Sequence, residues 1–461
     1  MSADPVRRRA ISVLVQAGQG GRLDPLLDQA LDALRSAGAE PRDRAFLAEL
    51  VRGTLQWQLR YDHLIRRYAR RQPPTDPGLL ALLRLSLHQL VALDQVPPFA
   101  ALHQAGELCR QDISPRLVGF VNGLLQAARR ELRPDETTGP QERTGRLRAA
   151  FADLGEGTPA GLAAWHAHPR WLVDRWLKRL GAETTAALLA ANNRPVPVAF
   201  RVLEPQDPQA ARALLAQAGC PTDPGADDPR ILVCGDRPDR ATIGSLLERW
   251  GWLLVQDPNV QRATSWLLEG LGTPAAPVLD LCAAPGGKTR RLAAAWPGLP
   301  LLVAADLRTD RLPLLRQATA RITGCPVVLL AADGTAPPLR PGSCAVVLLD
   351  GPCSGTGVLR HHPEARLQLK RGVPAANGPT LLALAARAAE LLRPGGVLLY
   401  ATCSLEPEEN EQVLDRLLAC GVPLVPLPHH RDGRWRRTWV PGAAPDGDGD
   451  GFFAARLRRA D

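Results

Sequence analysis

The stretch Val278-Leu-Asp-Leu-Cys-Ala-Ala-Pro-Gly-Gly-Lys-Thr289 decides the fold of the C-terminal half of the chain. Its apolar start predicts a buried strand, and the small residues before Lys288 predict a tight turn that opens a helix. Such a turn lets backbone N–H groups approach a polar or anionic ligand group at the helix N-terminus. The spacing matches neither the P-loop nor Gly-x-Gly-x-x-Gly, so it disfavours a phosphate cradle or an ordinary dinucleotide site.

Four further apolar runs complete the pattern of a parallel α/β sheet. They span residues 301–305, 327–330, 346–349 and 397–400, and longer helix-compatible stretches separate them. Each strand of the pattern ends at or shortly before a chemically active side chain, and these are Asp280, Asp306, Asp333, Asp350 and Cys403. Because ligands bind at the carboxyl ends of parallel strands, we expect these side chains to line one site.

Asp306 ends the strand that follows the glycine-rich turn. An acid about 20 residues after such a turn accepts hydrogen bonds from ribose hydroxyls. An Asp after a strand also caps a following helix, and this second interpretation stays open for Asp306. Together with the missing phosphate cradle, the pattern favours a nucleoside ligand without a polyphosphate.

Two cysteines stand out from the other seven. Cys353 lies in Asp350-Gly-Pro-Cys-Ser-Gly-Thr-Gly-Val358, and Cys403 lies in Tyr400-Ala-Thr-Cys-Ser404. Small polar neighbours leave both thiols accessible at the ligand edge, where a thiolate is a strong nucleophile. Six cysteines are expected to be inert packing residues, namely Cys109, Cys220, Cys234, Cys325, Cys344 and Cys420. No Cys-x-x-Cys pair occurs, which argues against a disulfide framework or a zinc site.

The overall composition indicates a multidomain globular protein with a basic surface. The chain has 461 residues, a net charge of +9 and a pI near 9.4. This balance favours a polyanionic partner, although 53 arginines against three lysines also fit a bias towards GC-rich codons. The start lacks the apolar core of a signal peptide, and no run of about 18 apolar residues occurs. We therefore expect a cytoplasmic protein that does not cross a membrane.

Composition and periodicity divide the chain into four parts. Residues 1–135 show helical spacing, residues 136–160 are rich in linker residues, residues 161–270 form a small mixed domain, and residues 271–461 hold the α/β pattern. The first and last parts each carry a net charge of +5. A basic and aromatic cluster near the end of the chain is suited either to RNA contact or to a solvated loop, and it comprises Arg434, Trp435, Arg436, Arg437 and Trp439.

Residues 278–410 closely resemble the RNA 5-methylcytosine methyltransferases that use S-adenosylmethionine, a family with cysteines in Pro-Cys and Thr-Cys motifs. Asp43-Arg-Ala-Phe-Leu-Ala-Glu-Leu-Val-Arg-Gly-Thr-Leu55 and Leu82-Leu-Arg-Leu-Ser-Leu-His-Gln-Leu90 are similar to the NusB-like RNA-binding domain. The similarity continues at residues 256–262 and 450–453. It implies an all-helical NusB-like domain, a small mixed α/β middle domain and a Rossmann-like methyltransferase domain.

The resemblance also implies a set of functional residues. S-adenosylmethionine would be held by Cys282, Ala283, Ala284, Pro285, Gly286, Gly287, Lys288, Asp306, Arg311, Asp333 and Asp350. The catalytic residues would be Cys403, Cys353, Asp350 and Lys288. The implied reaction is methylation of C5 of a specific cytosine in small-subunit (16S) ribosomal RNA, in which Cys403 adds to C6 of the base and Cys353 assists release. We expect a monomer that needs no metal.

Three other functions were weighed against this one. The same enzyme could act on tRNA, and the sequence does not separate these substrates. An RNA-binding assembly or antitermination factor with an inert cofactor domain is a different class, but it has no need for Cys353, Cys403, Asp350 and Lys288. DNA methylation is least favoured, because the DNA cytosine methyltransferases use the thiol of the Pro-Cys motif as nucleophile and do not require a Thr-Cys motif.

Three short segments depart from the family pattern. Gly351 stands where the family commonly has Ala, and Phe200-Arg-Val-Leu203 replaces the usual Leu-Arg-Val-Asn. Ala375-Ala-Asn-Gly378 replaces a Gln-rich run. The last change is expected to alter packing near Cys353 without removing a catalytic group.

Overall fold

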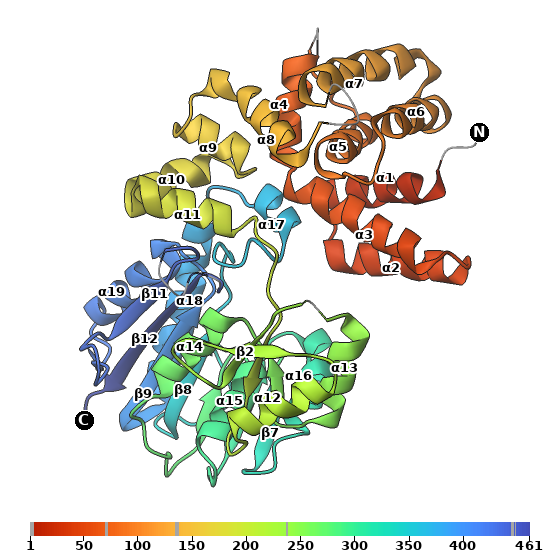
Figure 1. The fold of residues 1–461 in the computed structure, drawn as a ribbon. Coiled ribbons are helices and arrows are strands. Elements are labelled where there is room, and N and C mark those ends of the chain that lie inside the picture. Colours follow the sequence, from red (N-terminus) through yellow and green to blue (C-terminus); the bar gives the residue numbers. More distant parts are fainter. Residues whose placement is uncertain (1–3, 70–71, 134–137, 237, 444–446, 448) are drawn as a thin grey trace. The chain divides into compact units, whose positions relative to one another are not determined.

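The computed structural model describes residues 4–69, 72–133, 138–236, 238–443, 447 and 449–461. The chain forms two compact units, which are shown in Figure 1. The first consists of Met1–Asn193 and His361–Leu369, and the second consists of Arg194–Arg360 and Lys370–Asp461. The first unit is helical and the second carries the sheets, which confirms the predicted fold class.

The first unit packs its helices around α5, whose sequence is nearly continuous leucine. α5 is buried almost all round, with Leu82 and Leu87 in one hydrophobic cluster and Leu85 in a second. A helix that is apolar on every side is stable only inside a bundle. The elements of this unit are α1 Pro5–Gly18, α2 Leu23–Ser36, α3 Pro41–Gln56, α4 Gln58–Tyr68, α5 Pro77–Ala92, α6 Pro98–Leu108, a π-helical turn Cys109–Ile113, a 3-10 turn Pro115–Leu117, α7 Val118–Leu132, α8 Pro140–Ala149, a 3-10 turn Ala152–Leu154, α9 Pro159–Trp165, α10 Arg170–Leu180, α11 Ala182–Ala191 and α17 Pro363–Gln368.

The segment expected to be a linker, residues 136–160, contains ordered helix. Its N-terminal boundary lies among residues 134–137, outside the described residues. After it, Leu147 of α8 and Phe151 pack into the same cluster as the helices before them. Burial of these two apolar residues stabilises the packed segment. The Pro, Thr and Gly content of the segment indicated a linker instead. The helical unit also extends to Asn193, beyond the predicted start of the middle domain at residue 161.

One short helix of the first unit comes from a distant part of the sequence. α17 lies between β8 and β9 of the second unit in the sequence, but it packs with α1 and α3. The guanidinium of Arg366 is fully buried and donates hydrogen bonds to the backbone oxygen of Asn192 (3.0 Å) and to Oδ1 of Asn193 (2.9 Å). No feature of the sequence indicated that α17 packs in the helical unit.

The second unit begins with a small antiparallel sheet whose strand order is β2-β3-β1-β4. Its core contains Phe200, Val202 and Leu232, so the unusual Phe200 is a packing residue. Leu203 is also buried. The elements are β1 Ala199–Val202, α12 Pro208–Gln217, β2 Thr222–Pro224, β3 Ile231–Cys234, α13 Arg240–Arg249 and β4 Leu253–Val255. This small antiparallel sheet, with helices α12 and α13, confirms the expected mixed α/β character of the middle domain.

The large sheet of the second unit has the described strand order β10-β12-β9-β8-β5-β6-β7, and β11 pairs with β12. β5 to β9 are parallel, whereas β10, β11 and β12 are antiparallel additions that the sequence pattern did not reveal. The elements are α14 Pro258–Leu268, β5 Val278–Asp280, α15 Gly287–Ala295, β6 Leu302–Asp306, a 3-10 turn Thr309–Arg311, α16 Leu312–Thr319, β7 Val327–Ala331, β8 Cys344–Asp350, α18 Val373–Leu391, β9 Leu392–Thr402, η5 Pro407–Glu409 (a 3-10 turn), α19 Glu411–Ala419, β10 Leu424–Pro426, β11 Arg436–Trp439 and β12 Phe452–Arg459.

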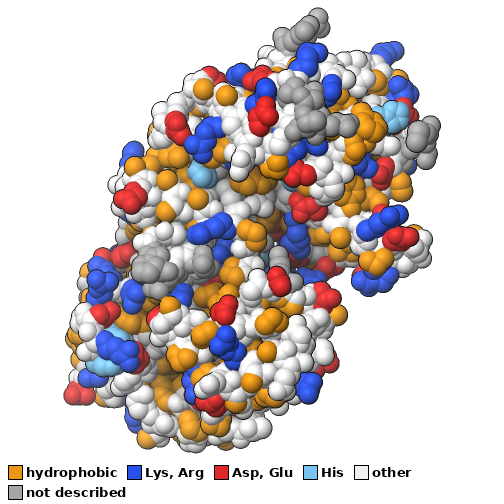
Figure 2. Space-filling model, in the orientation of Figure 1, with side chains coloured by type: hydrophobic (Ala, Val, Ile, Leu, Met, Phe, Trp, Pro, Cys, Tyr) orange, Lys and Arg blue, Asp and Glu red, His pale blue; other side chains and the backbone are white. Residues whose placement is uncertain are grey.

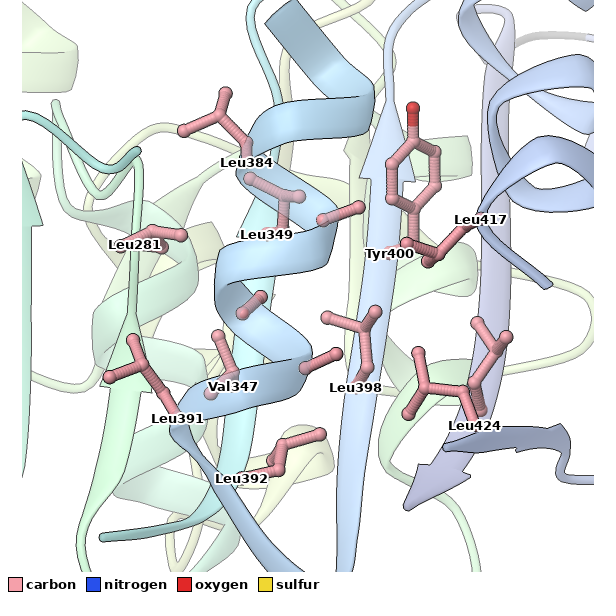
Figure 3. Close-up of a cluster of buried hydrophobic side chains, with 14 of the residues drawn as sticks. Leu281, Val347, Leu349, Leu384, Leu391, Leu392, Leu398, Tyr400, Leu417 and Leu424 are labelled. Carbon is pink, nitrogen blue, oxygen red and sulfur yellow. The ribbon is translucent and has the colours of Figure 1, made fainter. Parts of the chain in front are cut away.

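Alternating residues of these strands belong to two hydrophobic cores, because successive side chains of a strand point to opposite faces of the sheet. Val347, Leu398 and Tyr400 face α18 and α19, as Figure 3 shows. Val346 and Leu399, one residue away on each strand, face α14 and α15 instead. The sheet is therefore covered by helices on both faces. Functional groups are left to the ends of the strands.

The strand order reverses between β5 and β8. From β5 the chain runs outward through β6 and β7, and then returns to the other side of β5 with β8 and β9. Open α/β sheets bind ligands outside the carboxyl ends of the strands at such a switch point. The glycine-rich turn follows β5, and Asp350 ends β8. The fold thus places both at the expected binding crevice. Within the described residues, no helix combines the length and apolar character needed to span a membrane.

Candidate active site

The glycine-rich turn after β5 is shaped by close backbone packing. Gly286 has a φ of +106°, and a Cβ at this position would lie 2.7 Å from Cβ of Ala318. Only glycine adopts this conformation without strain, and only glycine fits the space. α15 begins at the next residue, so its free N–H groups point out of the turn. This is a cradle for a polar ligand group.

Asp306 joins the glycine-rich turn to the loop after β6. Its carboxylate accepts hydrogen bonds from the backbone N–H of Ala284 (2.9 Å) and of Arg308 (2.9 Å). Arg311 lies on the 3-10 turn just beyond. Asp333 is exposed two residues after β7 and accepts hydrogen bonds from the N–H and the hydroxyl of Thr335 (both 2.8 Å). Asp306 thus ends β6 and Asp333 follows the adjacent strand β7, as the sequence predicted.

The same edge of the sheet concentrates negative charge. Burial raises the pKa of Cys282, and the nearby carboxylates of Asp280, Asp306, Asp333 and Asp350 raise it further. Asp280 is fully buried, and burial raises its pKa to about 7 despite a 2.6 Å hydrogen bond from the hydroxyl of Thr289. A glycine cradle lined by carboxylates suits a ligand that carries hydroxyl groups and positive charge. S-adenosylmethionine, with its ribose, sulfonium and ammonium groups, fits these residues.

The two predicted cysteines meet at the neighbouring strand ends. Cys353 follows β8 and Cys403 follows β9, and these strands are parallel neighbours. Their sulfur atoms lie 3.2 Å apart. The hydrogen bond to Cys403, burial and the charge of Glu409 raise the pKa of Cys353 well above its ordinary value. Cys353 therefore holds a proton that it can donate to the Cys403 sulfur.

Lys288 and Asp350 form an ion pair beside the thiols. Nζ of Lys288 lies 2.6 Å from Oδ2 of Asp350 and 5.1 Å from the ring centre of Phe452. Burial alone would lower the pKa of Lys288, but Asp350 and the Cys403 sulfur outweigh burial and raise it. The ammonium group therefore stays charged. The ammonium group thus interacts electrostatically with both the Asp350 carboxylate and the Cys403 sulfur.

Sequence reasoning missed the groups that hold the cysteine loops. Glu409 is fully buried and bonded to the residues that follow both cysteines. On the other side, Arg360 donates hydrogen bonds of 2.7 Å to Asp257 and to Asp450. The sequence offered a weak signal for each of them. Glu409 lies in Pro-Glu-Glu-Asn just before a helix, where acids are common for reasons of capping and dipole alone.

The basic and aromatic cluster near the chain end forms β11 and its approach. Trp439 is buried, and the guanidinium groups of Arg436 and Arg437 lie 4.7 and 4.8 Å from the ring centres of Trp435 and Trp439. Arg436 also pairs with Asp415 (2.8 Å). Arg436, Arg437 and Trp439 thus lie on a strand, whereas Arg434 and Trp435 lie in the segment before it. Its contact with RNA stays a prediction.

The doubly wound sheet, the glycine cradle and the acidic strand ends define an S-adenosylmethionine-dependent methyltransferase. Comparisons with known proteins agree. Residues 273–458 match the model of 16S rRNA methyltransferase RsmB/F, residues 4–130 match the NusB family, and residues 168–233 match the ferredoxin-like domain of RsmF/B-like methyltransferases.

Two curated relatives and one solved structure extend over nearly the whole chain. Ribosomal RNA small subunit methyltransferase B of Pseudomonas putida is 32% identical over 91% of this chain and 91% of its own. The protein of the same name from Escherichia fergusonii is 30% identical over 97% and 96%. The crystal structure of PH0851 covers 100% of both chains with a TM-score of 0.74 at 24% identity, which shows a shared fold. The chain belongs to the RsmB/F family of S-adenosylmethionine-dependent rRNA methyltransferases.

Proposed function

We propose that this enzyme methylates C5 of a cytosine in small-subunit 16S rRNA, at the cytosine 967 site, through a covalent bond between Cys403 and C6 of the base. The observation that carries the proposal is the pair of thiols 3.2 Å apart beside the Lys288–Asp350 ion pair. C5 of cytosine is a poor nucleophile. Addition of a thiolate to C6 makes C5 enamine-like, and this explains why a reactive cysteine is needed.

The charge distribution supports Cys403 as the nucleophile. The ammonium of Lys288 interacts with the Cys403 sulfur, whereas Glu409 and the neighbouring sulfur keep Cys353 protonated. Asp350 is proposed to hydrogen-bond the N3 and amino edge of the base and so to stabilise the adduct. When bound, S-adenosylmethionine supplies the methyl group.

Cys353 is proposed to assist release of the product. Once Cys403 is bonded to carbon, its negative charge no longer opposes ionisation of Cys353. Cys353 then releases its proton to water, and the resulting thiolate accepts the C5 proton while the electrons of that C–H bond restore the C5–C6 double bond as the bond from C6 to Cys403 breaks. The Cys403 thiolate is regenerated, so the step balances in atoms and charge.

The target base must leave its stack to reach the two thiols, so we propose unpaired or flipped RNA as the substrate. Residues 1–135 are proposed to bind this RNA, supported by the NusB match and the net charge of +5. Figure 2 shows basic side chains interspersed with acidic ones on the face drawn, so phosphate contacts there would be scattered.

We further propose a cytoplasmic enzyme that needs no metal. We propose that it acts as a monomer, because one chain supplies both thiols, Lys288 and Asp350.

The substrate is tested by incubating the protein with labelled S-adenosylmethionine and either 16S rRNA or tRNA, and by mapping the labelled nucleotide. Label at a cytosine of 16S rRNA is expected. Transfer to tRNA together with no transfer to 16S rRNA would overturn the substrate, and no transfer to either would favour an inert assembly factor.

The roles of the thiols are tested by trapping. We expect Cys353→Ala to accumulate a covalent RNA adduct that denaturing gels detect. Cys403→Ala is expected to abolish both the adduct and methylation. Adducts that persist in Cys403→Ala would reverse the assignment.

A further inference from the structure

Glu409 connects the two cysteine loops. Oε1 of Glu409 accepts a hydrogen bond from the backbone N–H of Ser354 (2.7 Å), and Oε2 accepts one from the Ser354 hydroxyl (2.6 Å). The hydroxyl of Ser404 donates a further hydrogen bond to Oε2. Because Ser354 follows Cys353 and Ser404 follows Cys403, one carboxylate fixes both thiols relative to each other.

A third element completes the environment of this carboxylate. Nδ2 of Asn377 on α18 donates a 2.7 Å hydrogen bond to Oε1 of Glu409. Asn377 belongs to the segment in which this chain departs from the Gln-rich family pattern. Glu409 is fully buried, so these four donors and not water satisfy its carboxylate oxygens. A carboxylate that has four donors is held in one position.

The charge of Glu409 also acts on the Cys353 sulfur. The groups that face Cys353 are Cys403 and Tyr400 of the β9 end and Glu409 of η5. Tyr400 is neutral, since burial raises its pKa well above the ordinary value, and its hydroxyl donates to the backbone oxygen of Glu409. The negative groups around Cys353 oppose its ionisation, whereas Cys403 interacts with the Lys288 ammonium.

We propose that Glu409 is a positioning residue that locks the two cysteine loops together and keeps Cys353 a neutral thiol until Cys403 has attacked the base. The proposal deepens the proposed function and rests on it for its catalytic meaning. Its structural content, a charge that controls the ionisation of Cys353, does not depend on the substrate. The two parts can therefore be tested separately.

The first test measures thiol ionisation without RNA or cofactor. In a Cys403→Ala background, the rate at which iodoacetamide alkylates Cys353 is followed by peptide mass spectrometry between about pH 6 and pH 10. Glu409→Gln is expected to move the midpoint down by about one pH unit, which makes alkylation about tenfold faster below the midpoint. Glu409→Asp keeps the charge and is expected to keep the midpoint.

Loosening of the loop alone gives a different result. A more accessible thiol reacts faster at every pH, but its midpoint does not move. A faster plateau with an unchanged midpoint in Glu409→Gln would therefore overturn the proposal. Glu411→Gln, which removes the same charge from the first turn of α19, is the matched control and is expected to leave the midpoint unchanged.

A second variant covers the case in which Glu409→Gln does not fold. Ser354→Ala removes one hydroxyl donor and leaves the Glu409 charge less compensated. The Cys353 midpoint is then expected to rise. A fall of the midpoint in this variant would overturn the proposal.

The final test measures methyl transfer with both cysteines present. Glu409→Gln is expected to lower kcat about a hundredfold, whereas KM for S-adenosylmethionine changes less than about twofold because the glycine cradle is intact. If the thiol midpoint shifts as expected but wild-type protein methylates no RNA, the proposed function fails and the role of Glu409 stands. If wild-type protein is active and the midpoint does not shift, the role of Glu409 fails alone.

Discussion

The glycine-rich turn after β5 and the cysteine loops after β8 and β9 share one edge of the sheet but are built differently. The turn is shaped by backbone, and Gly286 fits because it has no Cβ. The cysteine loops are held by side chains, chiefly the Glu409 carboxylate and the Lys288–Asp350 pair. The cofactor half should therefore be sensitive to added volume, and the cysteine half should be sensitive to changes of charge.

The largest effect is expected from a charge change in the cysteine half. Lys288→Met leaves the carboxylate of Asp350 without its 2.6 Å partner and removes the positive charge near Cys403. We expect the rate of methyl transfer to fall by about a thousandfold, the upper range for loss of one electrostatic group at a reacting centre. Single-turnover transfer of labelled methyl to 16S rRNA measures it.

Two further lysine variants sharpen this result. Lys288→Arg keeps the charge, but the guanidinium is larger and planar, and the space between Asp350 and the Phe452 ring fits an ammonium. It is expected to lose at least about tenfold in rate. Lys178→Met changes an exposed residue of α10, so it is the control and should be fully active. A Lys288→Met enzyme within tenfold of wild type would contradict the view that charge governs this half.

A buried carboxylate at the end of β5 tests whether the cofactor half also responds to charge. Burial raises the pKa of Asp280 to about 7, whereas an Asp in the unfolded chain has a pKa near 4. Below pH 4 the group is protonated in both states and costs nothing. As pH rises towards 7 only the unfolded state releases the proton, so the folded state loses up to about 4 kcal/mol.

Asp280→Asn removes this loss. The variant is expected to unfold at a higher temperature than wild type at pH 8.5, and at pH 5 the advantage should shrink by more than half. Thermal unfolding at the two pH values measures the difference. Asp333→Asn is the control, because hydrogen bonds from Thr335 lower the pKa of the exposed Asp333 and no gain is expected at pH 8.5. An equal advantage of Asp280→Asn at both pH values would show that packing, and not charge, is responsible.

Added volume in the cofactor half should give the next largest effect. Gly286→Ala places a Cβ 2.7 Å from Cβ of Ala318 and also strains a backbone with a φ of +106°. We expect a loss of about 3 kcal/mol in stability together with weaker binding of S-adenosylmethionine, measured by unfolding and by calorimetry.

Gly298 separates strain from crowding. It has a φ of +84°, but no atom lies within 4 Å of a Cβ built there. Gly298→Ala therefore carries strain alone and is expected to cost about 1 kcal/mol without affecting cofactor binding. If the two variants lose equal stability, crowding at the glycine-rich turn is unimportant and the contrast between the two halves disappears.

The sequence was sufficient to predict which candidate side chains lie directly at strand ends. Asp306, Asp350 and Cys403 were placed correctly because strand periodicity fixes where a parallel strand ends and the sheet brings those ends together. Glu409 was not identified, because its role depends on loops that meet only in three dimensions. An acid before a helix is also common for local reasons.

The other features that the sequence did not predict are contacts between segments that lie far apart in the sequence. α17 packs against α1 and α3, which lie more than 300 residues earlier in the sequence, and its own sequence carries no mark of that partner. β12 pairs with β9 through residues such as Phe453 and Leu457, whose run is too short to be distinguished from the end of a loop. Only the gain in buried apolar area, visible after folding, selects these pairings.

The smallest effect is expected from added volume in the cysteine half, at Gly351. This residue departs from the common Ala of the family, and a Cβ here would lie 2.2 Å from Cδ2 of buried Leu381. Because Leu381 is a side chain that can shift, Gly351→Ala should cost only about 1 kcal/mol and leave methyl transfer within threefold of wild type. Chemical denaturation and the rRNA assay measure the two quantities.

Leu381→Val removes the Cδ2 atom that the added Cβ would meet. The variant therefore tests whether the Leu381 side chain is the part that shifts. Alone it should cost about 1 kcal/mol, but combined with Gly351→Ala the total loss should be smaller than the sum of the two, since each change relieves the other. Strict additivity would mean that the end of β8 moves instead of Leu381. The position of Cys353 would then depend on backbone packing, as the cofactor cradle does, and the cysteine half could no longer be distinguished from it by the kind of change it tolerates.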